Sequence, residues 1–285
     1  MKILLNKKIQ IILIFIFLFY FKAIASTPLN IRVSNVRDTQ FSVSWVTFNQ
    51  EIGQIRYGIS KSNYENWLTE FDDRDMNFVG DTHHITLSKL AHNKTYLYEI
   101  ISGDGQYNNS GEFYNITTGP VIPPNLGDFC QPAGKVFINS NLTNPAYNAI
   151  AYITIIGKSE DSATESMIIT PDGYWFRDLG NFRTNNNNLL FPYICGESSI
   201  RVELEGGQMG FAIMETLAVH FTSLNDIRAS ITLNPYQTKS YELENIINIL
   251  QILAGFNKAP NTDGFDKKIG INDAIFMLKK NYDLK

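Results

Sequence analysis

The sequence is poor in the residues from which most reaction centres are built. Its 285 residues include only two cysteines and four histidines. It contains no G-x-S-x-G motif, no HExxH motif and no cysteine beside a plausible base. After the N-terminus, no segment is long and apolar enough to cross a membrane, which takes about 20 residues. These absences predict a chain that is soluble and is not an enzyme.

The N-terminus has the composition of an export signal. Three lysines precede an apolar run at residues 9–21, and Ala23 and Ala25 then provide the small residues that a signal peptidase recognises. Cleavage after Ala25 is the favoured interpretation, and an uncleaved N-terminal anchor is the alternative. We therefore expect residues 1–25 to be a signal peptide and the mature chain to be secreted, extracellular or periplasmic, with no membrane association after cleavage.

The charge balance is mildly acidic. The formal net charge is −4, and residues 1–25 hold four lysines and no acidic residue, so their removal would leave −8. An acidic surface argues against nucleic acid or anionic lipid as the partner. The two cysteines, Cys130 and Cys195, are candidates for a disulfide in an oxidising compartment. The sequence leaves their pairing open because it cannot show that their Cβ atoms meet.

Alternation of apolar and polar residues dominates the first module, residues 27–118. In "FSVSWVT", Phe41, Val43 and Trp45 point to one face of a strand, while Ser42 and Ser44 point to the other. The segments "QIRYG" and "TYLYEII" show the same period. Turn-rich segments separate these strands at the spacing of an all-β sandwich.

Two adjacent histidines, His83 and His84, lie in another such strand, "THHITLSKL". Neighbouring residues of a strand point to opposite faces, so this pair cannot ligate one ion without a bulge. We assign His83 to the inward set and His84 to the outward set. The remaining histidines fall in a turn and in another module, and a metal site needs converging ligands. The sequence therefore predicts a structural strand here.

The first module resembles a fibronectin type III domain, and more narrowly the N-terminal domain that precedes the catalytic domain of purple acid phosphatases. The stretches that carry this resemblance are "IRVSNVRDTQFSVSWVT", "IRYGISKSNY", "THHITLSKLAHNKTYLYEI" and "EFYNITTG". Trp45 matches the core tryptophan, and Leu90 followed by Tyr96 matches the tyrosine corner. His92 and Lys94 stand where the family often has Pro and Thr.

The resemblance does not extend to the phosphatase's dimetal site, which belongs to a separate α/β domain. Motifs of the GDxxY, GNHE and GHxH types do not follow in this sequence. A phosphatase-related metallohydrolase is therefore kept as the alternative to a non-catalytic protein, and no catalytic residue is assigned.

A second module is expected over residues 120–235, after the proline-bearing linker "GPVIPPNLG". Its expected strands are "GKVFIN", "AIAYITII", "SMIIT", "GYWFRDL", "SIRVELE" and "ASITL". The pattern resembles the carboxypeptidase regulatory-like (transthyretin-like) β-sandwich modules of secreted bacterial proteins. Glu203 and Glu205 share one strand face, which we interpret as solvated. Trp67 and Trp175 are candidates for stacking on a glycan, with packing inside the sandwiches as the alternative.

The hydrophobic period changes to that of helices in residues 239–285. "YELENIINILQILAGF" and "IGINDAIFMLKKNYD" each place apolar residues on one helical face. The arrangement resembles a dockerin or EF-hand-like module, which implies calcium and a cohesin-like partner. Asp263, Asp266 and Asp273 are the candidate calcium ligands, although the loop lacks most of the oxygen ligands that calcium requires. The alternative is a helical hairpin with no cofactor.

These patterns predict a mainly β fold, in which two tandem immunoglobulin-like β-sandwich domains precede a small α-helical, dockerin-like hairpin. The predicted function is that of a non-catalytic, secreted modular protein. Its expected partner is a cell-surface scaffold, another protein or a glycan, bound through exposed loops.

Overall fold

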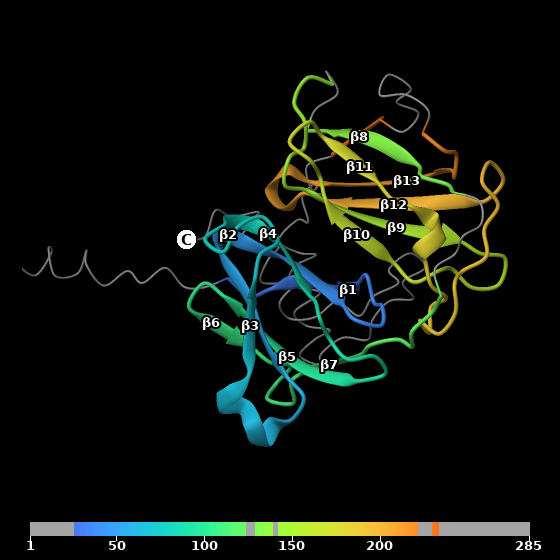
Figure 1. Ribbon diagram of the computed structural model, residues 1–285. Helices are drawn as coiled ribbons and strands as arrows, with labels where there is room; N and C mark the ends of the chain where they lie inside the picture. Colours follow the sequence, from blue (N-terminus) through green and yellow to red (C-terminus); the bar gives the residue numbers. More distant parts are fainter. Residues whose placement is uncertain (1–25, 124–128, 139–141, 222–229, 234–285) are drawn as a thin grey trace, which may run out of the picture.

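The computed structural model describes residues 26–123, 129–138, 142–221 and 230–233 (Figure 1). The predicted signal peptide and the predicted helical module with Asp263, Asp266 and Asp273 lie outside these described residues. No helix in the described part of the chain is long and apolar enough to cross a membrane.

The first sandwich is built around one long strand, β2, which takes part in both of its sheets. The strands are β1 (Leu29–Ser34), β2 (Phe41–Gly58), β3 (Leu68–Phe71), β4 (Val79–Leu87), β5 (Thr95–Ser102), β6 (Gly105–Tyr107) and β7 (Tyr114–Thr117), with a 3-10 helix η1 (Lys61–Asn66). The first half of β2 pairs with β1 and β4, and the second half pairs with β3 and β5. Its register with β4 shifts between Val46 and Glu51, where the strand leaves one sheet for the other.

The predicted alternation places the core of the first sandwich correctly. Phe41, Val43 and Trp45 are fully buried. The Trp45 indole donates a hydrogen bond to Ser102 Oγ at 3.1 Å. The Ala91 N–H donates to Tyr96 Oη at 2.8 Å, which is the contact that a tyrosine corner makes. The fibronectin type III-like fold of this module is confirmed.

The second sandwich, drawn in green to orange in Figure 1, has a four-stranded and a three-stranded sheet. Its strands are β8 (Ala133–Phe137), β9 (Ile150–Ile156), β10 (Glu165–Ile168), β11 (Tyr174–Phe176), β12 (Ser199–Glu205), β13 (Phe211–Leu217) and β14 (Ser230–Thr232), with 3-10 helices η2 (Leu179–Asn181) and η3 (Gly207–Met209). The strand orders are β10-β9-β12-β13 and β11-β8-β14. Strand β14 runs parallel to β8, and the other pairs are antiparallel.

Alternating residues of β9 and β12 fill the core of the second sandwich together with Trp175 and Phe182, both fully buried. All six expected strands are present, and β13 is an additional strand. Gly206 and η3 form the short connection from β12 to β13, as the turn-like sequence "EGGQMG" indicates. The predicted mainly β, two-sandwich fold class is confirmed.

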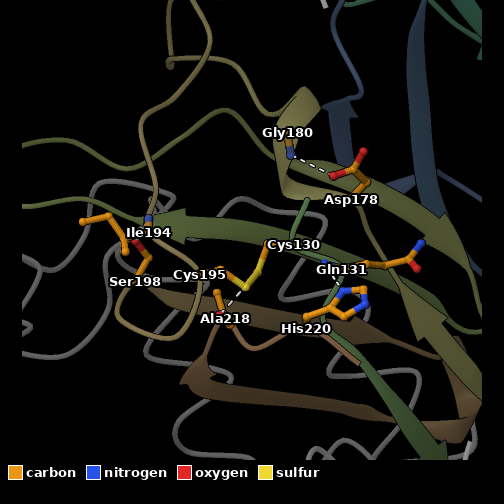
Figure 2. The surroundings of a disulfide bond; sticks show 9 residues. All are labelled: Cys130, Gln131, Asp178, Gly180, Ile194, Cys195, Ser198, Ala218 and His220. Atoms are coloured by element: carbon orange, nitrogen blue, oxygen red, sulfur yellow. Dashed lines mark hydrogen bonds between the residues drawn. A yellow bond between two sulfur atoms is a disulfide. The ribbon is translucent and has the colours of Figure 1, made fainter. Parts of the chain in front are cut away.

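A disulfide ties together the end of the second sandwich where the chain enters β8 (Figure 2). Cys130 and Cys195 are joined with an S–S distance of 2.04 Å, a pairing that the sequence left open. Close to it, the Gln131 N–H donates to His220 Nδ1 at 3.3 Å, and the Gly196 N–H donates to the Ala218 carbonyl at 2.7 Å. Three segments that are distant in sequence are thereby held at one point.

Candidate functional site

The candidate site is the contact between the two sandwiches, because polar side chains gather there in an unusual number. Alternation turns Ser42, Ser44 and His84 away from the core of the first sandwich, as predicted. They do not reach solvent, however. Ser42 and Ser44 are fully buried and His84 is 3% exposed. Strands β9 and β10 of the second sandwich cover this face.

Hydroxyl and amide groups make the buried part of the contact. Ser44 Oγ lies 2.7 Å from Tyr152 Oη, and Ser34 Oγ lies 2.6 Å from Ser166 Oγ. Asn35 accepts from the Ser166 N–H at 2.8 Å and donates from its Nδ2 to the Ser166 carbonyl at 3.1 Å. Asn35 directly follows β1 and has a left-handed backbone (φ 54°), a conformation that asparagine adopts more readily than most residues.

Ion pairs surround this buried part. Arg32 pairs with Glu203 at 2.8 Å, and Arg183 pairs with Asp38 at 3.2 Å. The Glu203 carboxylate is therefore engaged by the first sandwich and does not lie on a freely solvated face. The predicted solvated face at Glu203 is wrong, because Arg32 of the first sandwich lies against this carboxylate.

Arg74 forms a second buried bridge between the sandwiches. Its side chain is 5% exposed, pairs with Asp72 at 3.1 Å and donates to the Asn148 carbonyl at 2.7 Å. The hydroxyl of Thr82 donates to the same carbonyl at 2.9 Å. The guanidinium of Arg74 also stacks over Phe78, 4.2 Å from the ring centroid. Both Nη atoms of Arg74 donate hydrogen bonds, so this paired charge serves to fix the geometry of the contact.

His83 and His84 point in opposite directions and share no ligand position. The His83 ring stacks on Trp45 with ring centroids 4.9 Å apart, inside the first core. Burial, followed by the nearby charge of Arg74, lowers the pKa of His83 to about 3, so it is neutral at physiological pH. Within the described ranges, no group of three or more His, Cys, Asp or Glu side chains is placed to hold a metal ion.

His84 instead contacts Asp73 through one ring nitrogen and Ser166 through the other, an arrangement that the sequence did not indicate. His84 Nδ1 lies 2.8 Å from Asp73 Oδ2, and His84 Nε2 lies 2.7 Å from Ser166 Oγ. These are the contacts of a Ser-His-Asp relay. Each residue comes from a different strand or loop, and Ser166 comes from the other module, so no local motif could have indicated the arrangement.

The arrangement does not provide a usable nucleophile. Ser166 is fully buried, and its Oγ is also bound by Ser34 Oγ at 2.6 Å and by Asn35 Nδ2 at 3.1 Å. A nucleophilic oxygen must approach the substrate, and this one is enclosed by three protein partners. We therefore assign Asp73, His84 and Ser166 to the structural contact between the sandwiches.

A polar cavity of about 370 Å³ borders the buried contact, and we call it the interdomain cavity. Both sandwiches contribute to its lining, which consists of Asn35, Arg37, Gln40, Asp73, His84, Thr86, Glu165, Ser166, Met167, Ile168 and Arg177. Across it, Arg37 pairs with Glu165 at 2.9 Å.

The two tryptophans considered for glycan stacking are buried. Trp175 is fully buried in the second core, and Trp67 is 7% exposed. The Trp67 indole donates to the Ser60 carbonyl at 2.9 Å and packs against Phe113 with ring centroids 4.8 Å apart. The packing alternative is therefore correct for both, and neither ring offers a free face to a sugar.

The fold of the first module is that of a fibronectin type III-like sandwich, and comparison with known families agrees with this class. Residues 28–118 match the family model described as purple acid phosphatase, N-terminal domain. No curated protein sequence matches the chain.

Solved structures with several sandwich domains are among those similar to this chain. They include the FN1–FN3 domains of chicken CNTN1 (14% identity, TM-score 0.24, covering 69% of this chain and 67% of that one) and a two-domain fibronectin type III segment of chicken tenascin (10%, 0.22, 67% and 97%). The sensor domain of the anti-sigma factor RsgI4 of Pseudobacteroides cellulosolvens is also similar (12%, 0.24, 34% and 97%).

Proposed function

We propose that this chain is a non-catalytic, exported protein in which two β-sandwiches act together as one binding or spacing unit. Residues 239–285 are proposed to dock it to a cell-surface scaffold or another protein, with calcium held by Asp263, Asp266 and Asp273 when the loop takes it up. A glycan is an alternative partner.

The polar contact between the sandwiches is the observation that supports a joint unit. Two domains connected only by a flexible linker move independently, whereas a contact with many buried hydrogen bonds fixes their relative placement. A unit of fixed shape is suited to hold an attached segment at a set distance from its partner. Binding would then use the exposed loops at the ends of the sandwiches.

The match to a phosphatase N-terminal domain supports the non-catalytic part of the proposal and also defines the second candidate, a phosphatase-related metallohydrolase. A phosphomonoesterase assay on the purified mature chain, with Fe³⁺, Zn²⁺ and Mn²⁺ added in turn, separates the two. We expect no turnover above the buffer control. Turnover that is lost in His84→Asn but retained in His92→Asn, a control in an exposed turn, would establish the metallohydrolase instead.

A further inference from the structure

The interdomain cavity contains two arginines, and only one of them has a carboxylate partner. Arg37 donates to Glu165 at 2.9 Å. The other acidic side chain of the cavity, Asp73, accepts from the Thr86 N–H at 2.8 Å and the Thr86 hydroxyl at 2.7 Å, and contacts His84 at 2.8 Å. Both carboxylates are therefore already engaged by neighbouring groups.

Arg177 is the arginine of the cavity that has no carboxylate partner among the described residues. Its Nη2 donates to the Ser166 carbonyl, and no carboxylate of the described residues lies within ion-pair distance of its guanidinium. Burial lowers the pKa of Arg177, and the charge of Arg37 acts in the same direction against that of Glu165. A guanidinium nevertheless remains protonated at neutral pH. The cavity therefore holds a half-buried positive charge that the protein does not neutralise by direct pairing.

The unused donors of the two arginines belong to the same cavity. Nε of Arg37 and Nε of Arg177 are sealed from solvent without an acceptor. Their Nη1 atoms are not sealed, and neither has a hydrogen-bond partner in the part of the chain that the structure describes. Two guanidinium groups whose Nη1 donors are unpaired can together hydrogen-bond an anion that has two or more oxygens.

We propose that the interdomain cavity binds the oxyanion group of a small ligand, a carboxylate or a phosphate or sulfate group, with Arg177 as its principal contact and Arg37 as the second. Gln40 lies in the same lining, and its side-chain amide supplies a neutral donor. A volume of about 370 Å³ is at the small end of ligand pockets, so the ligand is a small molecule. This proposal is independent of docking through residues 239–285.

Thermal unfolding and calorimetry of the full mature chain test the proposal. Sodium phosphate, sodium sulfate and sodium acetate are compared with sodium chloride at matched ionic strength, because salt alone changes surface electrostatics. We expect at least one of the oxyanions to raise Tm by roughly 3–5 °C above chloride when present at about ten times its dissociation constant.

Two cavity variants and one control locate the effect. Arg177→Gln is expected to abolish the shift. Gln40→Glu places a carboxylate in the cavity without altering the buried contact. It is expected to raise the dissociation constant of the anion at least tenfold. Arg201→Gln is the control, because Arg201 is an arginine outside the cavity that pairs with Asp161 and Glu215.

The outcomes decide the proposal and the ligand class. A shift with acetate assigns carboxylates, whereas a shift with phosphate and sulfate alone assigns phosphate or sulfate groups. The absence of any shift beyond chloride would overturn the proposal. Retention of the full shift in Gln40→Glu would also overturn it, and this variant decides the matter if Arg177→Gln does not fold.

Discussion

Ser44 Oγ and Tyr152 Oη lie 2.7 Å apart, in a place where Ser44 is fully buried and Tyr152 is 2% exposed. The hydrogen bond joins β2 of one sandwich to β9 of the other. Burial raises the pKa of Tyr152 to about 12, so its hydroxyl is protonated at all physiological pH values and can donate. Removal of either partner leaves the other as a buried hydroxyl with one hydrogen bond fewer.

The first prediction concerns this pair. Tyr152→Phe and Ser44→Ala are each expected to lower the free energy of unfolding by about 1–2 kcal/mol. The double variant should lose less free energy of unfolding than the sum of the two single losses, with a coupling energy of about 1 kcal/mol. Urea unfolding measures all three. Tyr147→Phe, at a side chain that is 46% exposed, is the control and should change little. Strict additivity would show that the two hydroxyls do not interact.

The second prediction concerns the pH dependence of stability through His83. In the unfolded chain His83 takes up a proton near pH 6.5, whereas in the folded chain its pKa is about 3. Protonation therefore stabilises only the unfolded state, and stability falls as the pH drops below 6.5. The contribution of this single group is up to about 1.4 kcal/mol for each pH unit.

Unfolding at pH 7, 6 and 5 tests this contribution, because few carboxylates titrate in that range. His83→Gln cannot ionise and should show a shallower pH dependence than the wild type. His92→Gln removes an exposed histidine and should keep the wild-type slope. Equal slopes for the wild type and His83→Gln would contradict the prediction, because they would mean that His83 has the same pKa in the folded and the unfolded protein.

The third prediction concerns the disulfide. Cys130 and Cys195 are 65 residues apart, and a cross-link over a loop of this length is expected to stabilise the fold by about 2–5 kcal/mol. The double variant Cys130→Ala/Cys195→Ala and the reduced wild type should lose similar amounts in urea unfolding. A reducing agent should then have no further effect on the double variant. An unchanged midpoint on reduction would contradict the prediction.

The fourth prediction concerns calcium. We expect weak binding, with a dissociation constant on the order of 10⁻⁴–10⁻³ M, because the loop offers few carboxylates. Changing Asp263, Asp266 and Asp273 together to Asn should abolish the calorimetric signal. Asp104→Asn, in an exposed turn of the first sandwich, is the matched control. Calcium binding that survives the triple change would exclude this loop as the site.

Alternation predicted most of the fold, because the order of apolar and polar residues within each strand shows which face is buried. The strand containing Phe41, Val43 and Trp45 and the strand containing His83 follow this rule. The six strands expected in the second module were recovered for the same reason. The strand at Phe211–Leu217 is an edge strand whose outward Phe211 and Ile213 are exposed, so its polarity pattern is weak.

The candidate site was not predictable from the sequence in the same way. A residue that turns outward from one sandwich has the same pattern whether water or another domain covers it. His84, Ser166 and Arg177 meet because β10 lies against β1 and β4 of the first sandwich. Their separation in the sequence gives no sign of this. The only available signal was the excess of hydroxyl residues, Ser42 and Ser44 among them, at the outward positions of one strand.

The face that β9 and β10 cover has a consequence for how the two halves can be separated. It presents hydroxyls, an amide and an imidazole, and water can hydrate each of them when the neighbour is removed. A fragment ending near residue 118 should therefore remain soluble and monomeric, with no hydrocarbon patch laid bare by the cut. Domains held together by leucines and phenylalanines would aggregate after the same operation.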